Sequence, residues 1–181
     1  MKELFVSYEN QRAYYPRFFR LLESKLAKEQ RSLSRKVKFS SNWYKQKTKV
    51  AKIHNKIKNS RLDFLHKLST ELVNKYNAIA IEDLNMKGMS QALKFGKSVS
   101  DNGWGMFTTM LKYKTELSGK QLIKIDKYFP SSQLCSCCGQ VNPATKDLSY
   151  RNYTCDCGNS IDRDLNAAIN IKEFGANSLA Y

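Results

Sequence analysis

Cys135-Ser136-Cys137-Cys138-Gly139 and Cys155-Asp156-Cys157-Gly158 are two short cysteine-rich turns in a chain of 181 residues. Four thiolates can hold a zinc ion tetrahedrally, and two ligands close in sequence can come from one tight turn. A glycine after each pair lets the backbone amides turn toward the sulfur atoms. The spacing predicts a zinc ribbon over residues 131–159, with residues 150–154 as the return strand of a hairpin between the pairs. Its ligands are Cys135, Cys138, Cys155 and Cys157, and because no coordination position stays open, the ion has a structural role.

Two alternatives for the cysteines stay open. Cys137 could replace Cys138 in the first pair, but two Cys-x-Cys pairs would be unusual, so we expect Cys137 to stay unligated. The other alternative is five thiols without a metal. The residues after Met1 do not resemble a signal peptide, so we expect a cytoplasmic protein, and in a reducing compartment clustered cysteines favour metal over disulfides. His54 and His66 lie far from the cysteines in sequence, and we expect neither to be a ligand.

Acidic residues form a second group of candidates. The second cysteine pair is followed by Asp162-Arg163-Asp164-Leu165-Asn166-Ala167-Ala168, an acidic helix start with small residues suited to packing on a sheet. Glu82 ends a predicted strand, where functional groups gather in open α/β sheets. If the fold brings Glu82 and Asp164 together, their hard oxygen atoms could bind Mg²⁺ and support phosphodiester cleavage. The plainer alternatives are a helix N-cap for Asp162, an acid favoured by the helix dipole for Asp164 and a solvated Asp83.

Positive charge is concentrated in the first third of the chain. The net charge is +15, and residues 1–61 hold 17 Lys/Arg against 4 Asp/Glu, a balance of +13 that leaves +2 for the other 120 residues. This asymmetry, with aromatic residues between the charges, predicts contact with nucleic acid. The alternative is a solvated helix face that keeps the protein soluble. No apolar run approaches about 18 residues, so we expect no membrane span.

Hydrophobic periodicity predicts an α/β order of elements. Two basic amphipathic helices, 16–33 and 43–76, are separated by a break and are expected to form an antiparallel pair. The strand at 78–81 is predicted to be buried on both faces. Residues 1–13 give no clear signal. The remaining predictions are a loop at 85–101, a helix at 102–118 stopped by Gly119, a strand at 121–126 and a helix at 162–174 stopped by Gly175.

Several motifs follow one another along nearly the whole chain. They are Ile81-Glu82-Asp83-Leu84-Asn85, Phe129-Pro130-Ser131-Ser132, the two cysteine pairs and Asp162-Arg163-Asp164-Leu165-Asn166-Ala167-Ala168. In this order they resemble the C-terminal part of TnpB proteins, which insertion sequences encode. The resemblance implies a RuvC-like nuclease domain of RNase H fold, interrupted by a zinc ribbon, that cuts DNA with a guide RNA and Mg²⁺. By motif, Glu82 corresponds to the second catalytic carboxylate, Asp164 to the third, and the four paired cysteines to the zinc ligands.

One motif of the family has no counterpart in this sequence. The first catalytic Asp of the family lies on the opening strand of the nuclease fold in an Asp-x-Gly context, and no such segment precedes the basic helices. We therefore expect an incomplete RuvC-like domain that is inactive alone, with a second polypeptide supplying the missing half. Strand 78–81 would then lack neighbours and expose an apolar edge. The alternatives are a non-catalytic DNA- or RNA-binding remnant and a pseudogene product that does not fold. The expected regions are 1–76 (basic helices), 77–130 (second carboxylate), 131–159 (ribbon) and 160–181 (third carboxylate).

Overall fold

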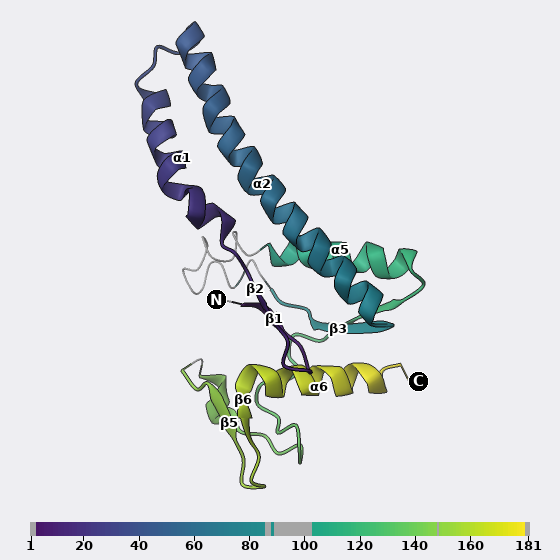
Figure 1. The fold of residues 1–181 in the computed structure, drawn as a ribbon. Coiled ribbons are helices and arrows are strands. Elements are labelled where there is room, and N and C mark those ends of the chain that lie inside the picture. Colours follow the sequence, from purple (N-terminus) through teal and green to yellow (C-terminus); the bar gives the residue numbers. More distant parts are fainter. Residues whose placement is uncertain (1–2, 86–87, 89–102, 148, 180–181) are drawn as a thin grey trace.

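A computed structural model describes residues 3–85, 88, 103–147 and 149–179 of the chain. Figure 1 shows a long helical arm, a middle layer of short strands, and a lower part in which helix α6 (Arg163–Asn177) lies over the cysteine-rich region. Within the described residues the strands pair only two by two, in three separate sheets. In these same ranges, no helix is both long enough and apolar enough to cross a membrane.

The arm consists of α1 (Phe18–Ser34) and α2 (Ser41–Lys75), joined by a short turn (Figure 1). Both helices begin within a turn of their predicted starts at residues 16 and 43. Ser40 caps α2 by accepting a hydrogen bond from the backbone amide of Trp43, which satisfies one of the free amides of the first turn. The apolar stripes of the two helices meet in a cluster of Leu26, Ile53 and Ile57, surrounded by Phe18, Phe19, Leu22 and Val50. Full burial of such a side chain contributes about 1.5–3 kcal/mol, so this seam holds the arm together.

The main hydrophobic core lies in the middle of the molecule. There α2 and α5 (Trp104–Leu117) meet a hairpin of β1 (Glu3–Val6) and β2 (Arg12–Tyr14). The hairpin occupies residues that gave no sequence signal, because its short strands are packed by partners distant in the chain. The ring of Phe5 stacks on that of Phe107, for example, with centroids 5.9 Å apart. The buried core residues are Leu4, Tyr15, Leu65, Val73, Ile81, Phe107, Met110 and Leu111.

Strands β3 (Ala78–Glu82) and β4 (Gln121–Ile125) pair in parallel, with α5 in the connection between them, so the predicted strand–helix–strand order is observed. The pairing register places Glu82 opposite Ile125. Burial of β3 on both faces was predicted, and this is wrong: only Ile81 is buried, because a two-stranded sheet offers little cover. The expectation that this strand lacks neighbours is also wrong on one edge, where β4 pairs with it. Along its other edge no described strand pairs.

Two glycines that were predicted to stop helices behave differently. Gly119 follows α5 with φ of 63°, a conformation that ends a helix at little cost for glycine. Gly175, by contrast, lies inside α6 and does not end it. A Cβ atom there would lie 2.6 Å from the Cβ atom of Ala80, so the missing side chain lets α6 approach β3 closely. The predicted loop at 85–101 lies outside the described residues, apart from Asn85 and Gly88.

Candidate metal centre and carboxylate site

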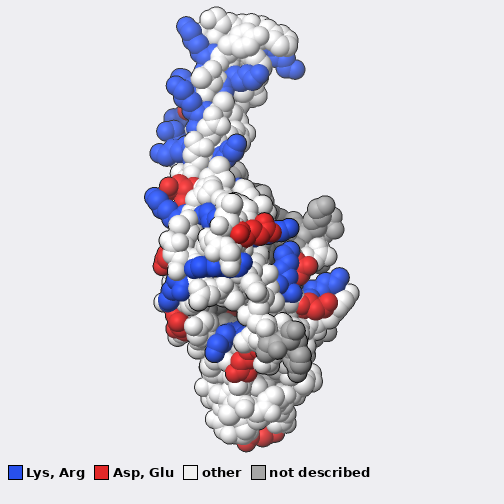
Figure 2. Space-filling view, turned by 90° about the vertical axis from the view of Figure 1, so that its right-hand side faces the viewer, with Lys and Arg blue, Asp and Glu red and all other residues white. Residues whose placement is uncertain are grey.

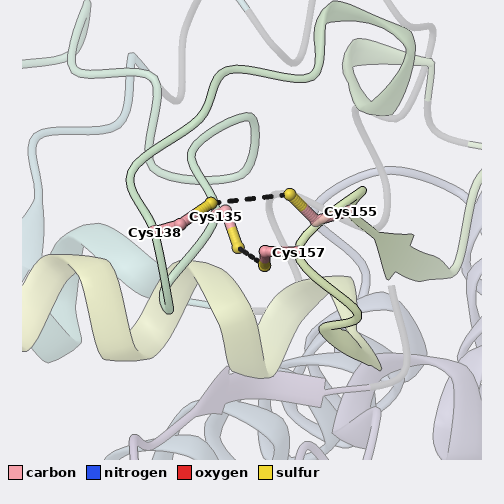
Figure 3. A group of neighbouring side chains, drawn as sticks. All are labelled: Cys135, Cys138, Cys155 and Cys157. Atoms are coloured by element: carbon pink, nitrogen blue, oxygen red, sulfur yellow. Dashed lines mark hydrogen bonds between the residues drawn. The ribbon is translucent and has the colours of Figure 1, made fainter.

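The four cysteines predicted as zinc ligands come together in space (Figure 3). The Sγ atoms of Cys135, Cys138, Cys155 and Cys157 all lie within 4.8 Å of one another. The Sγ of Cys135 is 3.7 Å from that of Cys157, and the Sγ of Cys138 is 3.6 Å from that of Cys155. Four thiolates with Zn–S bonds of about 2.3 Å have sulfur atoms roughly 3.8 Å apart, so the group is compatible with structural zinc. Cys137 is exposed and lies outside the group, as expected.

Both cysteine pairs are held by turns of the same kind. The backbone amide of Gly139 donates to the carbonyl of Cys135 at 2.9 Å, and that of Gly158 donates to the carbonyl of Cys155 at 3.0 Å. The two glycines have φ of 76° and 88°, which glycine adopts without strain. This conformation explains why each pair is followed by glycine. His54 and His66 lie on α2 and are not part of any potential metal-binding group among the described residues.

The strands around the second cysteine pair differ from the prediction. Strand β5 (Asn152–Thr154) lies within the predicted return strand, but it pairs antiparallel with β6 (Ser160–Asp162). The predicted hairpin between the two cysteine pairs is therefore wrong. The turn that carries Cys155 and Cys157 joins β5 directly to β6, whereas the segment after Cys138 contains a short 3₁₀ helix, η1 (Pro143–Lys146). A short connection closes a hairpin at lower entropic cost than a long one.

The electrostatics of the cysteine group favour a cation. Burial opposes the ionisation of Cys135, but hydrogen bonds from the Asn159 side chain and from backbone amides of the same turn outweigh it and lower the pKa of this thiol to about 6. The backbone amide of Gln140 lowers the pKa of Cys138, yet the neighbouring Cys157 and Cys135 outweigh it, and the net pKa is raised. One thiolate therefore forms readily and disfavours the next. A divalent ion is the group that would stabilise four thiolates together.

A buried tyrosine supports the cysteine group. Tyr153 of β5 is fully buried, and the single proton of its hydroxyl is shared between the carbonyls of Gln133 and Gln140, both at 3.1 Å. Burial, followed by the nearby cysteines, raises the pKa of Tyr153 to about 12. The hydroxyl thus stays protonated and tethers both sides of the first cysteine turn.

Two asparagines on α6, which sequence reasoning missed, anchor the cysteine region to the helix. Asn166 is fully buried; its side-chain amide donates to the carbonyl of Leu134 and its oxygen accepts from the amide of Ser136 at 3.0 Å. Asn170 donates to the carbonyls of Ser131 and Leu134, both at 2.8 Å. Residues four apart share one face of a helix. A pair of asparagines at this spacing, beside alanines, was the sequence signal that could have revealed the anchor.

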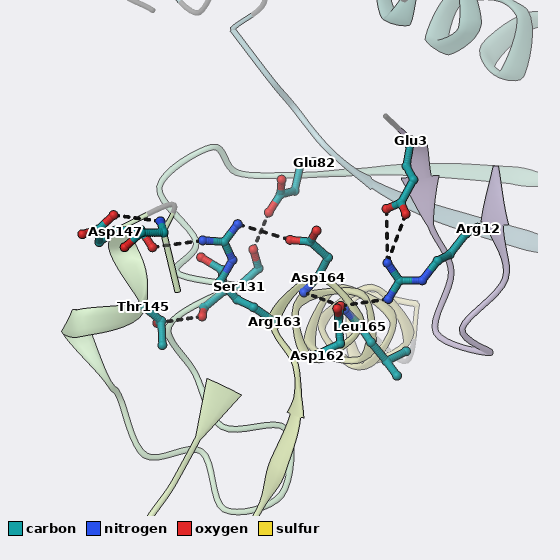
Figure 4. A network of polar contacts seen from close by, with 12 residues as sticks. Glu3, Arg12, Glu82, Ser131, Thr145, Asp147, Asp162, Arg163, Asp164 and Leu165 are labelled. Carbon is teal, nitrogen blue, oxygen red and sulfur yellow. Dashed lines mark hydrogen bonds and ion pairs between the residues drawn. The ribbon is translucent and has the colours of Figure 1, made fainter. Parts of the chain in front are cut away.

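Glu82 lies at the C-terminal end of β3, as predicted, and is connected to α6 (Figure 4). The hydroxyl of Ser131 donates to its carboxylate, and the carbonyl of the same serine accepts from Asn170 on α6. Asp164 lies in the first turn of that helix, six residues before Asn170 and roughly 9 Å along the helix axis. Ser131 thus links Glu82 to the helix that carries Asp164.

Asp164 has a basic neighbour. The guanidinium of Arg163, which is buried, lies 3.4 Å from the Asp164 carboxylate and also donates to the carbonyl of Asp147 at 3.1 Å (Figure 4). Arg163 therefore places a buried positive charge beside the carboxylate of Asp164. Asp83, in contrast, is exposed and pairs with Lys124 at 3.1 Å, consistent with the plain alternative of a solvated acid.

Asp162 is the N-cap of α6, which confirms the N-cap role given for it as an alternative in the sequence analysis. Its carboxylate accepts from the backbone amides of Asp164 and Leu165, both at 3.0 Å, and pairs with Arg12 of β2 at 3.1 Å. Burial raises the pKa of Asp162, but the Leu165 amide and Arg12 outweigh it, so the pKa lies below its usual range. Arg12 also pairs with Glu3 at 3.2 Å, which ties the N-terminal hairpin to the start of α6.

The family of the chain follows from comparison with known proteins. Residues 1–93 match the family model OrfB_IS605, described as "Probable transposase", and residues 104–171 match the model "Cas12f1-like, TNB domain". The first match covers more than half of the 181 residues, so the chain belongs to this transposase family. It is a TnpB-type protein, as the motifs predicted.

Curated relatives agree with this family. The chain is 44% identical over 160 residues to the "Putative RNA-guided DNA endonuclease" of Streptomyces pristinaespiralis, covering 88% of this chain and 40% of that protein. It is 35% identical over 178 residues to the "Putative RNA-guided DNA endonuclease InsQ" of Escherichia coli (strain K12), covering 90% and 44%. The chain therefore spans less than half the length of these relatives.

A solved structure shares the fold. A chain from the "Cryo-EM structure of the Cas12f1-sgRNA-target DNA complex" superposes with a TM-score of 0.58 at 18% sequence identity. The match covers 89% of this chain and 43% of that chain. At this identity the likeness concerns the α/β fold alone.

Proposed function

We propose that the chain forms the C-terminal part of an RNA-guided DNA endonuclease, with an incomplete RuvC-like domain built from residues 77–130 and 160–181. The observation that carries this proposal is the connection of Glu82 through Ser131 to the helix that bears Asp164. Residues 131–159 form the zinc ribbon between the two parts, and residues 1–76 form the basic helical region. DNA and a guide RNA are the proposed partners, by analogy with the names of the relatives.

The two acidic residues are suited to a hard cation. Carboxylate oxygens are preferred ligands of Mg²⁺, which when bound would activate water and stabilise charge at a phosphodiester. Ser131 orients Glu82 by donating to one of its oxygens, leaving the other for a ligand. Arg163 lies beside Asp164 at 3.4 Å, and this ion pair helps to hold the Asp164 side chain in place.

Two carboxylates bind Mg²⁺ more weakly than three. The resemblance implies a third, in an Asp-x-Gly context, and residues 1–17 contain no Asp. We propose that this third carboxylate comes from chain outside residues 1–181, either as part of a longer protein or as a second polypeptide. The cleavage site is then complete only when both parts are present.

Cleavage and metal binding test this proposal together. The chain is co-expressed with the N-terminal part of the Streptomyces pristinaespiralis relative, and Mg²⁺-dependent cutting of plasmid DNA is measured. Glu82→Ala and Asp164→Ala should each abolish cutting, and each should weaken Mn²⁺ binding by the chain, followed by electron paramagnetic resonance. Asp83→Ala is the matched control, since it removes an exposed carboxylate next to Glu82. Cutting that persists in Glu82→Ala would reject the assigned role.

A second candidate function, nucleic-acid binding without catalysis, is favoured by the charge of the arm. Residues 30–62 contain 11 Lys/Arg and no Asp or Glu. Binding that releases counterions weakens steeply with salt, by about 10³-fold between 50 and 200 mM if roughly six phosphates are contacted. Binding that does not change with salt would contradict this function. Binding with no cutting by the co-expressed parts would favour it over the nuclease.

A further inference from the structure

The turn at the far end of the arm carries three aromatic rings that the core does not use. We name Phe39, Trp43 and Tyr44 the tip cluster. The ring centroids of Phe39 and Trp43 are 5.5 Å apart, and those of Trp43 and Tyr44 are 5.0 Å apart. Phe39 is 73% exposed, although proteins usually bury phenylalanine, and Tyr44 is 52% exposed. The cluster therefore presents ring surface to solvent more than 30 residues away in sequence from the acidic site.

Positive charge surrounds this cluster. Residues 30–62 include the tip cluster, and all 11 charged residues in this stretch are Lys or Arg. The ammonium group of Lys47 lies 4.9 Å from the centroid of the Trp43 ring. Figure 2 shows Lys and Arg side chains projecting on both sides of the outer arm. The chemistry that fits exposed rings among cations is an anion that also has flat apolar faces.

The backbone of Phe39, which carries one of these rings, has an unfavourable conformation. Phe39 has φ of 65°, in the left-handed region that an aromatic side chain rarely adopts. Its position just before the cap Ser40 is also that of a hydrophobic staple, in which a side chain packs on the first helical turn. A staple stabilises by burial, and Phe39 stays largely exposed. Strain without burial at an exposed ring is typical of a binding surface.

We infer that the tip cluster stacks on unpaired bases of single-stranded nucleic acid, while the surrounding Lys and Arg residues contact its phosphates. This rests on the proposed nucleic-acid binding and adds where and in which form the strand is held. Bases in a duplex are stacked on one another, so their faces are covered. Aromatic platforms therefore select unpaired strands with little sequence preference.

The test measures binding of the intact chain to a labelled single-stranded oligonucleotide and to its duplex. Stacking is worth about 1–3 kcal/mol per base, so Phe39→Gly and Trp43→Ala should each weaken single-strand binding by roughly 5- to 150-fold. Duplex binding should change less than about twofold, and the salt dependence of both should stay the same, since no phosphate contact is removed. Trp43→Phe should keep most of the affinity. Val37→Ala is the control, because Val37 is exposed in the same turn and has no ring.

Phe39→Gly also separates binding from folding. Glycine adopts the left-handed conformation freely, so the melting temperature should stay equal or rise while single-strand affinity falls. A staple without a binding role gives the opposite result, a lower melting temperature with unchanged affinity. That outcome would overturn the inference.

The remaining outcomes separate this inference from the function on which it rests. If the wild-type chain binds neither oligonucleotide, nucleic-acid binding itself fails. If it binds with steep salt dependence but the tip variants match wild type, only the tip assignment fails. Vesicles of phosphatidylcholine with and without phosphatidylglycerol test the other anionic surface that suits basic residues and tryptophan. Tip variants that lose vesicle binding but keep oligonucleotide binding would identify a membrane contact instead.

Discussion

The arm and the cysteine region of the same chain are held together by different kinds of interaction. The seam of the arm is apolar, built on Leu26, Ile53 and Ile57. Around the cysteine region most buried side chains are polar: Ser131, Thr145, Arg163, Asn166 and Asn170. Hydrophobic burial is tolerant and needs no cofactor, whereas a buried polar network stabilises only when every partner is present. The arm should therefore survive losses that dismantle the cysteine region.

The largest effect should come from metal removal. Structural zinc contributes folding free energy directly, with apparent binding energies of about 10–16 kcal/mol in small zinc-dependent domains. Chelation should therefore unfold residues 131–159, seen as rapid hydrogen exchange and proteolysis there, while exchange in α1 and α2 stays slow. Cys138→Ser should have the same effect and Cys137→Ser should not, since Cys137 lies outside the group.

This experiment can also fail in informative ways. Purified protein without stoichiometric zinc would contradict the metal centre. A chain that forms no protease-resistant core even with zinc would favour the pseudogene alternative. Loss of the arm together with the ribbon would show that the two regions fold as one cooperative unit.

Asn166 should be the most sensitive polar residue of the lower region. Asn166→Ala leaves the amide of Ser136 without its partner and opens a small cavity, at a cost of about 2–4 kcal/mol. Because the segment that bears Cys135 is no longer anchored, zinc should also transfer faster to a competing chelator. Denaturant unfolding and the rate of zinc release measure the two effects. Asn177→Ala, at an exposed position of the same helix, should change neither.

Contacts between distant residues also explain what the sequence could and could not predict. Periodicity placed α1, α2, α5 and β4 within a few residues, and spacing identified the four cysteines, because both signals are local. The hairpin that contains Phe5, the pairing of β5 with β6 and the anchor at Asn166 were missed or wrong. The hairpin that contains Phe5 and the anchor at Asn166 depend on partners far along the chain, such as Phe107 for Phe5, which no short window contains. The pairing of β5 with β6 is local, but the turn between them carries Cys155 and Cys157 and was interpreted only as part of the metal site.

Gly175 makes the same point on a smaller scale and can be tested. Gly175→Ala puts a methyl group within 2.6 Å of the Ala80 Cβ, so α6 must move away from β3. The overpacking costs about 1–3 kcal/mol, partly offset by up to about 1 kcal/mol of helix propensity, for a net loss of roughly 1–2 kcal/mol in the free energy of unfolding. Adding Ala80→Gly should restore part of it.

The matched control for this change is Gly105→Ala in α5. No atom lies within 4 Å of the Cβ that it would add, so only helix propensity changes. This variant should be neutral or more stable than wild type. Equal effects of the two substitutions would show that the contact between Gly175 and Ala80 does not constrain the packing of α6.

The smallest effect concerns the link between the N-terminal hairpin and the lower region at Asp162. Its pKa in the folded protein lies below the unfolded value of about 3.9, so the ionised carboxylate contributes stability that is present above that value and is lost as the pH falls through the folded pKa. Asp162→Asn keeps a capping oxygen but loses the pairing with Arg12, which is partly exposed, so the cost at pH 7 should be under about 1 kcal/mol. The difference in the free energy of unfolding between wild type and Asp162→Asn, measured by urea unfolding at each pH, should shrink toward pH 3. Zinc loss on acidification affects both proteins and therefore cancels in this difference.

The control is Asp83→Asn, which breaks the exposed pair with Lys124 and should show a smaller difference from wild type. A gap between wild type and Asp162→Asn that stays constant across the acid range would mean that the cap, and not the charge, joins the two regions.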